Sequence, residues 1–244
     1  MLRPPDLALD SAMFLDLDGT LADIEARPQD VAFDPERAAL IAGLERVLGG
    51  AVAVISGRSL QDMDRILGGA PRAVSAVHGL ARRRADGHVI QASSSPALDT
   101  AREALRGLVQ RWPGLILEDK GLSLAVHYRQ APSAAGAVED AVARILAAAP
   151  LVRQDGKMVC ELRAPGPDKG AALDAFMQEA PFAGRRPVMA GDDVTDESAF
   201  AAAAAGGGFG VLVGPPRRTA ATYRLDGVQE VKAWLRAGLT AVAA

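Results

Sequence analysis

The sequence predicts an α/β fold, in which a mainly parallel sheet forms one domain and a smaller α+β domain is inserted into it. In the outer parts of the chain, short uninterrupted apolar runs such as 51–55 alternate with segments of helical periodicity. This is expected of strands that a parallel sheet buries on both faces. Between about 96 and 165 the pattern becomes helix-strand-strand and occurs twice, which is typical of an antiparallel sheet covered by helices on one face. The length of 244 residues allows two unequal domains.

In the first part of the chain, each predicted strand ends in a polar residue. The strand that contains Phe14 and Leu15 runs into the acidic turn 16–19. A helix begins after Asp34, which a proline follows, and the strand 51–55 ends at Ser56. Ser56 is either a site residue or the N-cap of a helix over 60–67. A third strand, 73–77, ends at His78, for which we expect a structural role.

The inserted segment contains two predicted helices, at about 98–112 and 138–146, each followed by two strands. The strands fall at about 115–119, 122–128, 151–154 and 158–163, with Asp155-Gly156 as a hairpin turn. Their alternation separates an apolar face from a polar face, which carries Glu118, Lys120, His127, Arg129, Glu161 and Arg163. This polar face is either a binding surface or a solvated one.

After the proline-rich linker 165–167, helices and strands alternate again. A helix begins near Lys169, and the strand 187–190 runs into the acidic segment 191–197. The long uncharged stretch 198–216 is mainly alanine and glycine, which insert poorly into membranes. We expect it to be a buried helix, a glycine turn and the strand 209–213, followed by a last helix over 228–239.

Composition and charge exclude several classes of function. Hydrophobic residues make up 49% of the chain and charged residues 23%, as in ordinary globular proteins. The net charge of -3 and the lack of a basic stripe argue against a nucleic-acid partner, and we expect the run Arg82-Arg83-Arg84 to be solvated. Cys160 is the single cysteine, which favours a reducing cytoplasm, and we expect neither a signal peptide nor a membrane anchor. The oligomeric state stays open, and a monomer is compatible with the sequence.

Acidic, hydroxyl and basic side chains gather at the ends of the predicted strands. Asp16 and Asp18 are two residues apart, so a strand would project both to one side. Such a pair can bind a hard cation and divide nucleophilic attack and proton transfer between its members, although a polar turn is the alternative. In a parallel sheet the strand ends at Asp16, Ser56 and Asp192 share one edge, where Lys169 also begins a helix. We therefore predict a Mg²⁺-dependent phosphoryl-transfer site.

These residues resemble the four motifs of the haloacid dehalogenase-like (HAD) phosphatases. In the family's order, the motifs are Asp16-x-Asp18-Gly19-Thr20, Ser56, Lys169 and Gly191-Asp192-Asp193-x-x-Asp196. Three longer segments are similar to the trehalose-6-phosphate phosphatase family, namely 55–58, 118–123 and 191–197. The resemblance implies a Rossmann-like, parallel-sheet HAD core of residues 1–96 and 165–244. It also implies an inserted αββ-αββ cap, residues 97–164, that confers substrate specificity.

The resemblance further implies a reaction and a cofactor. Such an enzyme hydrolyses trehalose 6-phosphate to trehalose and phosphate, a step of trehalose biosynthesis, through an aspartyl phosphate. Asp16 is then the nucleophile, and Asp18 protonates the leaving sugar oxygen and afterwards activates water. Mg²⁺ is bound by the Asp16 carboxylate, the Asp18 backbone carbonyl and Asp192. Ser56 hydrogen-bonds the phosphoryl group, while Lys169 offsets negative charge.

The same resemblance assigns the substrate contacts and the residues that support the metal site. The substrate contacts are Gly19, Thr20, Ser56, Gly57 and Arg58 in the core and Glu118, Lys120 and Glu161 in the cap. Asp193 and Asp196 support the metal shell, and we rank His127 and Arg129 below the three cap residues as sugar contacts. The alternatives are a phosphatase for another sugar phosphate, a phosphomutase, a phospho-receiver signalling domain, and a catalytically silent partner of a sugar-phosphate synthase.

Overall fold

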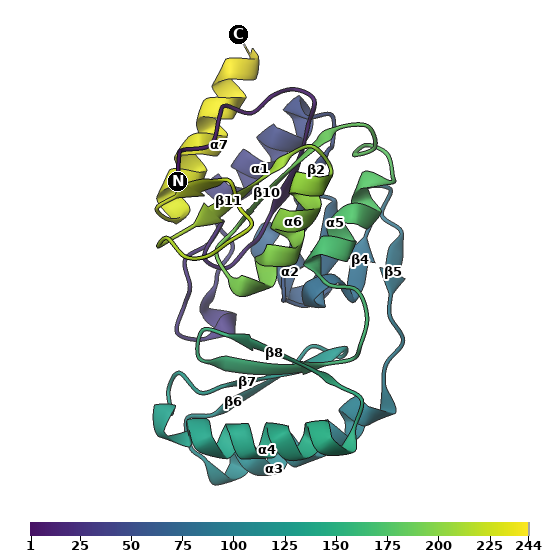
Figure 1. The fold of residues 1–244 in the computed structure, drawn as a ribbon, viewed down its shortest axis with the longest axis vertical. Helices are drawn as coiled ribbons and strands as arrows, with labels where there is room; N and C mark the ends of the chain where they lie inside the picture. Colours follow the sequence, from purple (N-terminus) through teal and green to yellow (C-terminus); the bar gives the residue numbers. More distant parts are fainter. Residues whose placement is uncertain (244) are drawn as a thin grey trace. The chain divides into compact units, whose positions relative to one another are not determined.

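The structure is a computed structural model and describes residues 1–243, which form two compact units. Unit 1 consists of Met1–Gln91 and the described residues from Pro167 onward, and unit 2 is Ala92–Gly166. Both are mixtures of helices and strands (Figure 1). The α/β fold class is therefore confirmed.

Unit 1 is built on an eight-stranded sheet with the order β12-β11-β10-β1-β2-β3-β4-β5. The first six strands of this order are parallel, and β4 and β5 pair antiparallel at one end. The strands are β1 (Ser11–Leu15), β2 (Val52–Ile55), β3 (Ala73–Ala76), β4 (Ala81–Arg83), β5 (Val89–Gln91), β10 (Arg186–Gly191), β11 (Phe209–Val213) and β12 (Tyr223–Leu225).

Five helices and three short 3₁₀ segments complete unit 1. Figure 1 shows α1 and α7 together on one face of the sheet and α5 and α6 together on the other. Asp34, Ser59 and Asp168 are N-caps of α1, α2 and α5, each accepting a backbone N–H of the first turn. The helices are α1 (Pro35–Val47), α2 (Leu60–Leu67), α5 (Lys169–Met177), α6 (Glu197–Ala205) and α7 (Val228–Ala243), with 3₁₀ turns at Pro28–Asp30, Val77–Gly79 and Val194–Asp196.

The strand order of unit 1 determines where a ligand can bind. The chain passes from β1 through β2 to β3 in one direction and later returns to place β10 on the other side of β1. The order therefore reverses between β1 and β10, and ligands of open α/β sheets bind outside the strand ends at such a point. Asp16 follows β1, and Asp192 follows β10. In the buried interior of unit 1, three aromatic rings pack against one another with centroids 5.2–6.1 Å apart, namely those of Phe14, Phe176 and Phe182.

Unit 2 is an antiparallel sheet of order β6-β7-β9-β8, with α3 and α4 covering one face (Figure 1). Its core includes Leu105 of α3, Val138 of α4 and the strand residues Leu124, Val126 and Leu162. The helix-strand-strand order predicted from the sequence therefore occurs twice. The elements are α3 (Pro96–Arg111), β6 (Ile116–Asp119), β7 (Ser123–His127), α4 (Ala135–Ala148), β8 (Val152–Gly156) and β9 (Val159–Arg163), with a 3₁₀ turn at Pro132–Ala134.

The arginine run of unit 1 differs from its prediction. Arg82 lies in β4, is only 8% exposed and donates two hydrogen bonds of 2.8 and 2.9 Å to Glu179. Its guanidinium carbon also lies 4.7 Å from the centre of the Phe176 ring. Arg84 pairs with Glu179 and Arg83 with Asp64. The prediction of a solvated run was wrong, because β4 extends the sheet and its side chains reach acids of neighbouring elements.

The uncharged stretch 198–216 folds as predicted, with α6 followed by a glycine turn and β11. Across residues 1–243, no helix has both the length and the apolar character that a membrane crossing needs.

Cys160 provides a test of the unit 2 core. It is 3% exposed, and burial raises the pKa of its thiol to about 12. We predict that Ellman's reagent at pH 8 modifies native Cys160 at least ~100-fold more slowly than the guanidinium-unfolded chain, because both access and the thiolate are lacking. Equal rates in the two states would contradict the packing of β9 against the helices.

Candidate active site

The predicted catalytic residues of unit 1 lie at the switch point between β1 and β10. The Asp16 amide donates to the Ala190 carbonyl of β10 at 2.9 Å, which fixes the start of the loop after β1. Lys169 is the first residue of α5, and Ser56 follows β2. Asp16, Lys169 and Ser56 are 5%, 3% and 2% exposed. The sheet topology thus brings together residues that are far apart in the sequence.

Lys169 bridges two carboxylates inside this site. Its ammonium nitrogen lies 2.9 Å from Asp16 Oδ1 and 2.7 Å from Asp196 Oδ1. Burial alone would lower the pKa of Lys169, but the two carboxylates raise it, so the side chain stays charged. A buried ammonium with two charge-assisted hydrogen bonds is strongly held in one position.

Three carboxylates meet around this ammonium. Asp16, Asp192 and Asp196 each offer an oxygen within 4.8 Å of the other two. The pKa of Asp16 lies well above its usual range, because burial disfavours the charged form and the nearby Asp196 and Asp192 repel it, while Lys169 opposes this only in part. Additional positive charge would keep Asp16 ionised, so this oxygen donor set fits a hard divalent cation.

Two motif glycines make this close approach possible. Gly19 has φ +85°, and a Cβ built on it would lie 2.3 Å from Asp192 Oδ2. A Cβ on Gly191 would lie 2.3 Å from Asp196 Cγ. Any larger residue at these positions would therefore displace a carboxylate of the cluster.

Asp196 and Asp193 have different local roles. Asp196 is completely buried, with Oδ1 accepting from Lys169 and Oδ2 accepting from the Asp193 amide at 3.0 Å. Asp193 accepts from the Val194 amide at 2.7 Å and caps the short turn that follows. Both oxygens of Asp196 are therefore engaged within the protein, although its carboxylate belongs to the same cluster as Asp16 and Asp192.

Asp18 is held by an arginine rather than by the carboxylate cluster. Arg58 Nε lies 2.7 Å from Asp18 Oδ2, and Arg58 Nη2 lies 2.8 Å from Asp18 Oδ1. Arg58 also donates to the Pro28 carbonyl at 2.9 Å and to Asp62. Burial would lower the pKa of Arg58, but its hydrogen bonds to Asp18 and Asp62 raise it. The resemblance placed Arg58 among the substrate contacts, and here its guanidinium orients Asp18.

The remaining predicted residues of unit 1 are Ser56, Gly57 and Thr20. The Ser56 hydroxyl oxygen accepts from the Arg58 amide at 3.3 Å. Gly57 leaves room for His78, since a Cβ there would lie 2.2 Å from Nε2 of the histidine ring. Thr20 is completely buried, and its hydroxyl has no hydrogen-bond partner in the described part of the chain.

The predicted cap residues of unit 2 form a second polar cluster. Lys120 Nζ lies 2.7 Å from Glu161 Oε2 and 4.0 Å from Glu118 Oε2. Glu118 Oε2 is also 2.8 Å from His127 Nε2. Burial would raise the pKa of Glu118, but Lys120 and then His127 lower it, so the carboxyl stays ionised. Arg129, which we ranked with His127 as a lesser candidate for a sugar contact, instead donates to the Lys157 carbonyl at 3.0 Å.

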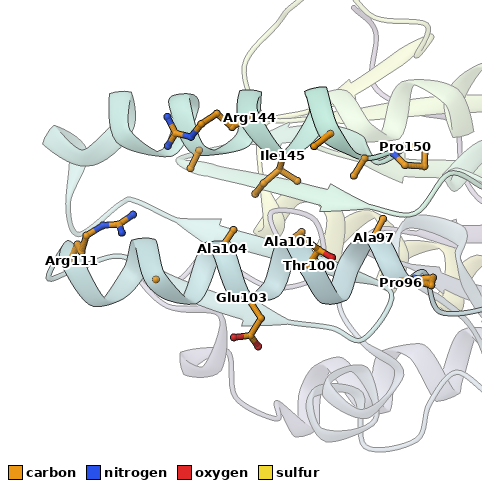
Figure 2. A pocket seen from close by; sticks show the side chains of 14 residues that line it. Pro96, Ala97, Thr100, Ala101, Glu103, Ala104, Arg111, Arg144, Ile145 and Pro150 are labelled. Atoms are coloured by element: carbon orange, nitrogen blue, oxygen red, sulfur yellow. The ribbon is translucent and has the colours of Figure 1, made fainter.

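Unit 2 also has a groove that the residues of its polar cluster do not line. It runs between α3 and α4 and has a volume of about 710 Å³ (Figure 2). Figure 2 shows small side chains such as Ala101 and Ala104 facing it, with Arg111 and Arg144 toward one end. None of the predicted site residues lines this groove.

Comparison of the chain with known proteins identifies its family. The family model described as trehalose-phosphatase matches residues 14–229, a span that includes Asp16, Arg58, Lys120, Lys169 and Asp196. The chain belongs to the trehalose-phosphatase family. Members of this family are phosphoric monoester hydrolases, so the chain is an enzyme of that class. HAD phosphatases use a metal ion, and the carboxylate cluster of unit 1 is consistent with one.

Two curated relatives of this trehalose-phosphatase match most of the chain. The trehalose-6-phosphate phosphatase of Escherichia coli (strain K12) is 40% identical over 245 residues, covering 99% of this chain and 91% of the relative. A probable trehalose-phosphate phosphatase of Sinorhizobium fredii is 39% identical over 207 residues, covering 84% of this chain and 78% of the relative.

Solved structures agree with the fold. A crystal structure of a trehalose-6-phosphate phosphatase related protein is 26% identical, with a TM-score of 0.81 and coverage of 95% of this chain and 98% of that one. A HAD-superfamily phosphatase from Bacteroides thetaiotaomicron, 16% identical, shares the fold with a TM-score of 0.63 and covers 99% of this chain and 96% of that one. The resemblance of the motifs to the trehalose-phosphatase family is confirmed by the family model and the curated relatives, and these two solved structures confirm the fold.

Gly19 gives a sharp test of the carboxylate cluster. Gly19→Ala would push the Asp192 carboxylate aside, and we expect phosphatase activity on an aryl phosphate to fall about 100-fold, as catalytic groups tolerate little displacement. Gly87→Ala is the matched control, because Gly87 has φ +91° and nothing within 4 Å of its added Cβ. Comparable losses in both variants, or none in Gly19→Ala, would contradict the close approach of Asp192.

Proposed function

We propose that this trehalose-phosphatase hydrolyses trehalose 6-phosphate to trehalose and phosphate, with Mg²⁺ as cofactor and an aspartyl phosphate as intermediate. The observation that carries this proposal is the buried Asp16 carboxylate at the end of β1. Its Oδ1 accepts a hydrogen bond of 2.9 Å from the ammonium nitrogen of Lys169. The named activity of the relatives supports the choice of substrate. The single cysteine agrees with a reducing cytoplasm as the place of the reaction.

In the first half of the proposed reaction, an Asp16 oxygen attacks phosphorus and the bond between phosphorus and the sugar oxygen breaks. Asp18 gives its proton to that leaving oxygen, which becomes a sugar hydroxyl. Lys169 stabilises the negative charge that collects when a phosphate dianion approaches Asp16. Ser56, at the end of β2, donates a hydrogen bond from its hydroxyl to a phosphoryl oxygen.

In the second half, water attacks the aspartyl phosphate while Asp18 takes up the water proton. Asp16 is regenerated as phosphate leaves. Both Asp18 oxygens accept hydrogen bonds from Arg58 in this structure. An oxygen that transfers a proton to the sugar must be released from that pair, so Arg58 is expected to hold Asp18 in a resting orientation between the two transfers.

Mg²⁺ would be held by the Asp16 and Asp192 carboxylates and by the Asp18 backbone carbonyl. The donor set is composed of oxygen, as Mg²⁺ requires, and the cluster of three carboxylates beside one lysine has an excess of negative charge. Bound there, the ion would neutralise charge on the phosphate. Asp196 supports Lys169 and the Asp193 turn instead.

Unit 2 is proposed to be the substrate-specificity cap. The sugar of trehalose 6-phosphate carries many hydroxyls, and each requires a donor or an acceptor when it leaves water. Glu118 and Glu161 supply carboxylate acceptors, and Lys120 supplies donors, on one face of the unit 2 sheet. This part of the protein would therefore recognise the sugar, while unit 1 carries out the chemistry.

A panel of sugar phosphates tests the proposed substrate and cofactor. We expect kcat/KM for trehalose 6-phosphate to exceed that for glucose 6-phosphate by at least ~100-fold, because the monosaccharide leaves polar groups of the cap unpaired. EDTA should abolish phosphate release, and excess Mg²⁺ should restore it. Equal rates for the two sugars would reject the substrate, and full activity in EDTA would reject the cofactor.

Asp18→Asn tests the division of labour between the two aspartates. The variant keeps the Asp16 nucleophile but lacks a base for water, so incubation with an aryl phosphate should leave a phosphoryl adduct on the protein. Intact-protein mass spectrometry measures this adduct. The double variant Asp16→Asn, Asp18→Asn is the control and should remain unmodified. Rapid turnover by Asp18→Asn would remove Asp18 from its role.

A further inference from the structure

One face of the unit 2 sheet aligns the proposed sugar-binding acids around a small residue. Strand pairing sets Glu118 of β6 opposite Ala125 of β7, and Ala125 opposite Glu161 of β9. Paired residues point to the same face, and so do residues two apart along a strand. His127, two residues after Ala125, therefore lies on the same face as both acids.

His127 is the nearest charged or polar partner of Glu118. Its Nε2 lies 2.8 Å from Glu118 Oε2, whereas Lys120 Nζ lies 4.0 Å from that oxygen and is closer to Glu161, at 2.7 Å. The side chains of His127 and Glu118 are only 20% and 23% exposed, so solvent screens this contact less than a surface pair. Because Glu118 stays ionised, Nε2 must be the protonated, donating nitrogen.

Both partners of Glu118 approach the same carboxylate oxygen. His127 Nε2 contacts Oε2 of Glu118 at 2.8 Å, and the Lys120 ammonium is 4.0 Å from the same oxygen. Among the described residues, none donates a hydrogen bond to the other oxygen, Oε1. Oε1 is therefore presented as an acceptor. Without the histidine, Glu118 could rotate toward the Lys120 ammonium, since opposite charges at this separation attract and the side chain has several rotamers. Such a rotation would withdraw the acceptor and also compete with Glu161 for Lys120.

We propose that His127 is a positioning residue for sugar recognition, whose Nε2–H holds Glu118 so that Oε1 accepts a hydrogen bond from a substrate hydroxyl. This inference rests on the proposed function, because it requires a hydroxyl-bearing substrate on the polar face of unit 2. His127 takes no part in phosphoryl transfer. Its loss should therefore weaken binding of the sugar phosphate without a matching loss in the hydrolysis of small aryl phosphates.

Three substitutions separate the hydrogen bond from the volume of the ring. His127→Gln can place an amide N–H near the position of Nε2, whereas His127→Asn places it near Nδ1, too far from Glu118. His127→Leu keeps a similar volume but has no donor. We expect KM for trehalose 6-phosphate to rise ~10-fold in the Asn and Leu variants, as for the loss of one charge-assisted hydrogen bond, and less than about threefold in the Gln variant.

Two controls make the result specific. His88→Asn changes an exposed histidine of unit 1 and should leave the kinetics unchanged. In a Glu118→Gln background, His127→Leu should raise KM by no more than about twofold, because the two residues act through one contact. A full ~10-fold effect in that background would show that His127 acts independently of Glu118 and would overturn the proposal.

The remaining outcomes are equally decisive. Equal KM values in the Gln and Asn variants, or a parallel loss of aryl phosphate hydrolysis, would overturn the positioning role. A wild-type enzyme that shows no preference for trehalose 6-phosphate would instead reject the proposed function. A clear wild-type preference combined with normal KM in all His127 variants would reject only the role of the histidine.

Discussion

The ion pairs of Lys169 are the constraint on which the rest of unit 1 depends. An unpaired buried charge is destabilising by several kcal/mol, so carboxylates can gather at the centre of a fold only with a cation among them. Lys169 supplies that cation to Asp16 and Asp196 at 2.9 and 2.7 Å. Because it is the first residue of α5, the helix must begin at the edge of the sheet where β1 and β10 end. The charge balance of the site therefore depends on the strand order of unit 1, because that order brings Lys169 beside Asp16 and Asp196.

The polar face of unit 2 also contains carboxylates close together, and here both a lysine and a histidine lie beside them. Its two glutamates, lysine and histidine contact one another, so each carboxylate has a partner within the protein. The contacts also keep the groups on one face of a sheet, where alternate residues have little freedom to turn away. A surface that binds hydroxyls benefits from this arrangement, since acceptors and donors held in place lose less conformational entropy when a ligand arrives.

The sequence was most informative where a local pattern determines the result. Uninterrupted apolar runs identified the buried strands, and the acids after β1 and β10 identified the site edge, because parallel strands must end there together. The pairing of Asp18 with Arg58 joins residues 40 apart, and no periodicity encodes such a contact. The strands β4, β5 and β12 were not predicted, since three residues are too few to show alternation. The contact between His127 and Glu118 needed the strand register, which alternation alone leaves open.

The inserted position of unit 2 has a consequence for the order in which the protein is made. Unit 2 is one continuous stretch of chain, so it can complete its core as soon as its own residues have left the ribosome. Unit 1 cannot, because Asp16 and Lys169 are 153 residues apart and its central strand β1 has β10 as a neighbour. Its N-terminal part must therefore wait, with the edge of β1 that pairs with β10 still open, until β10 has been synthesised. During translation, the part of this chain that most needs protection from aggregation is the first 91 residues.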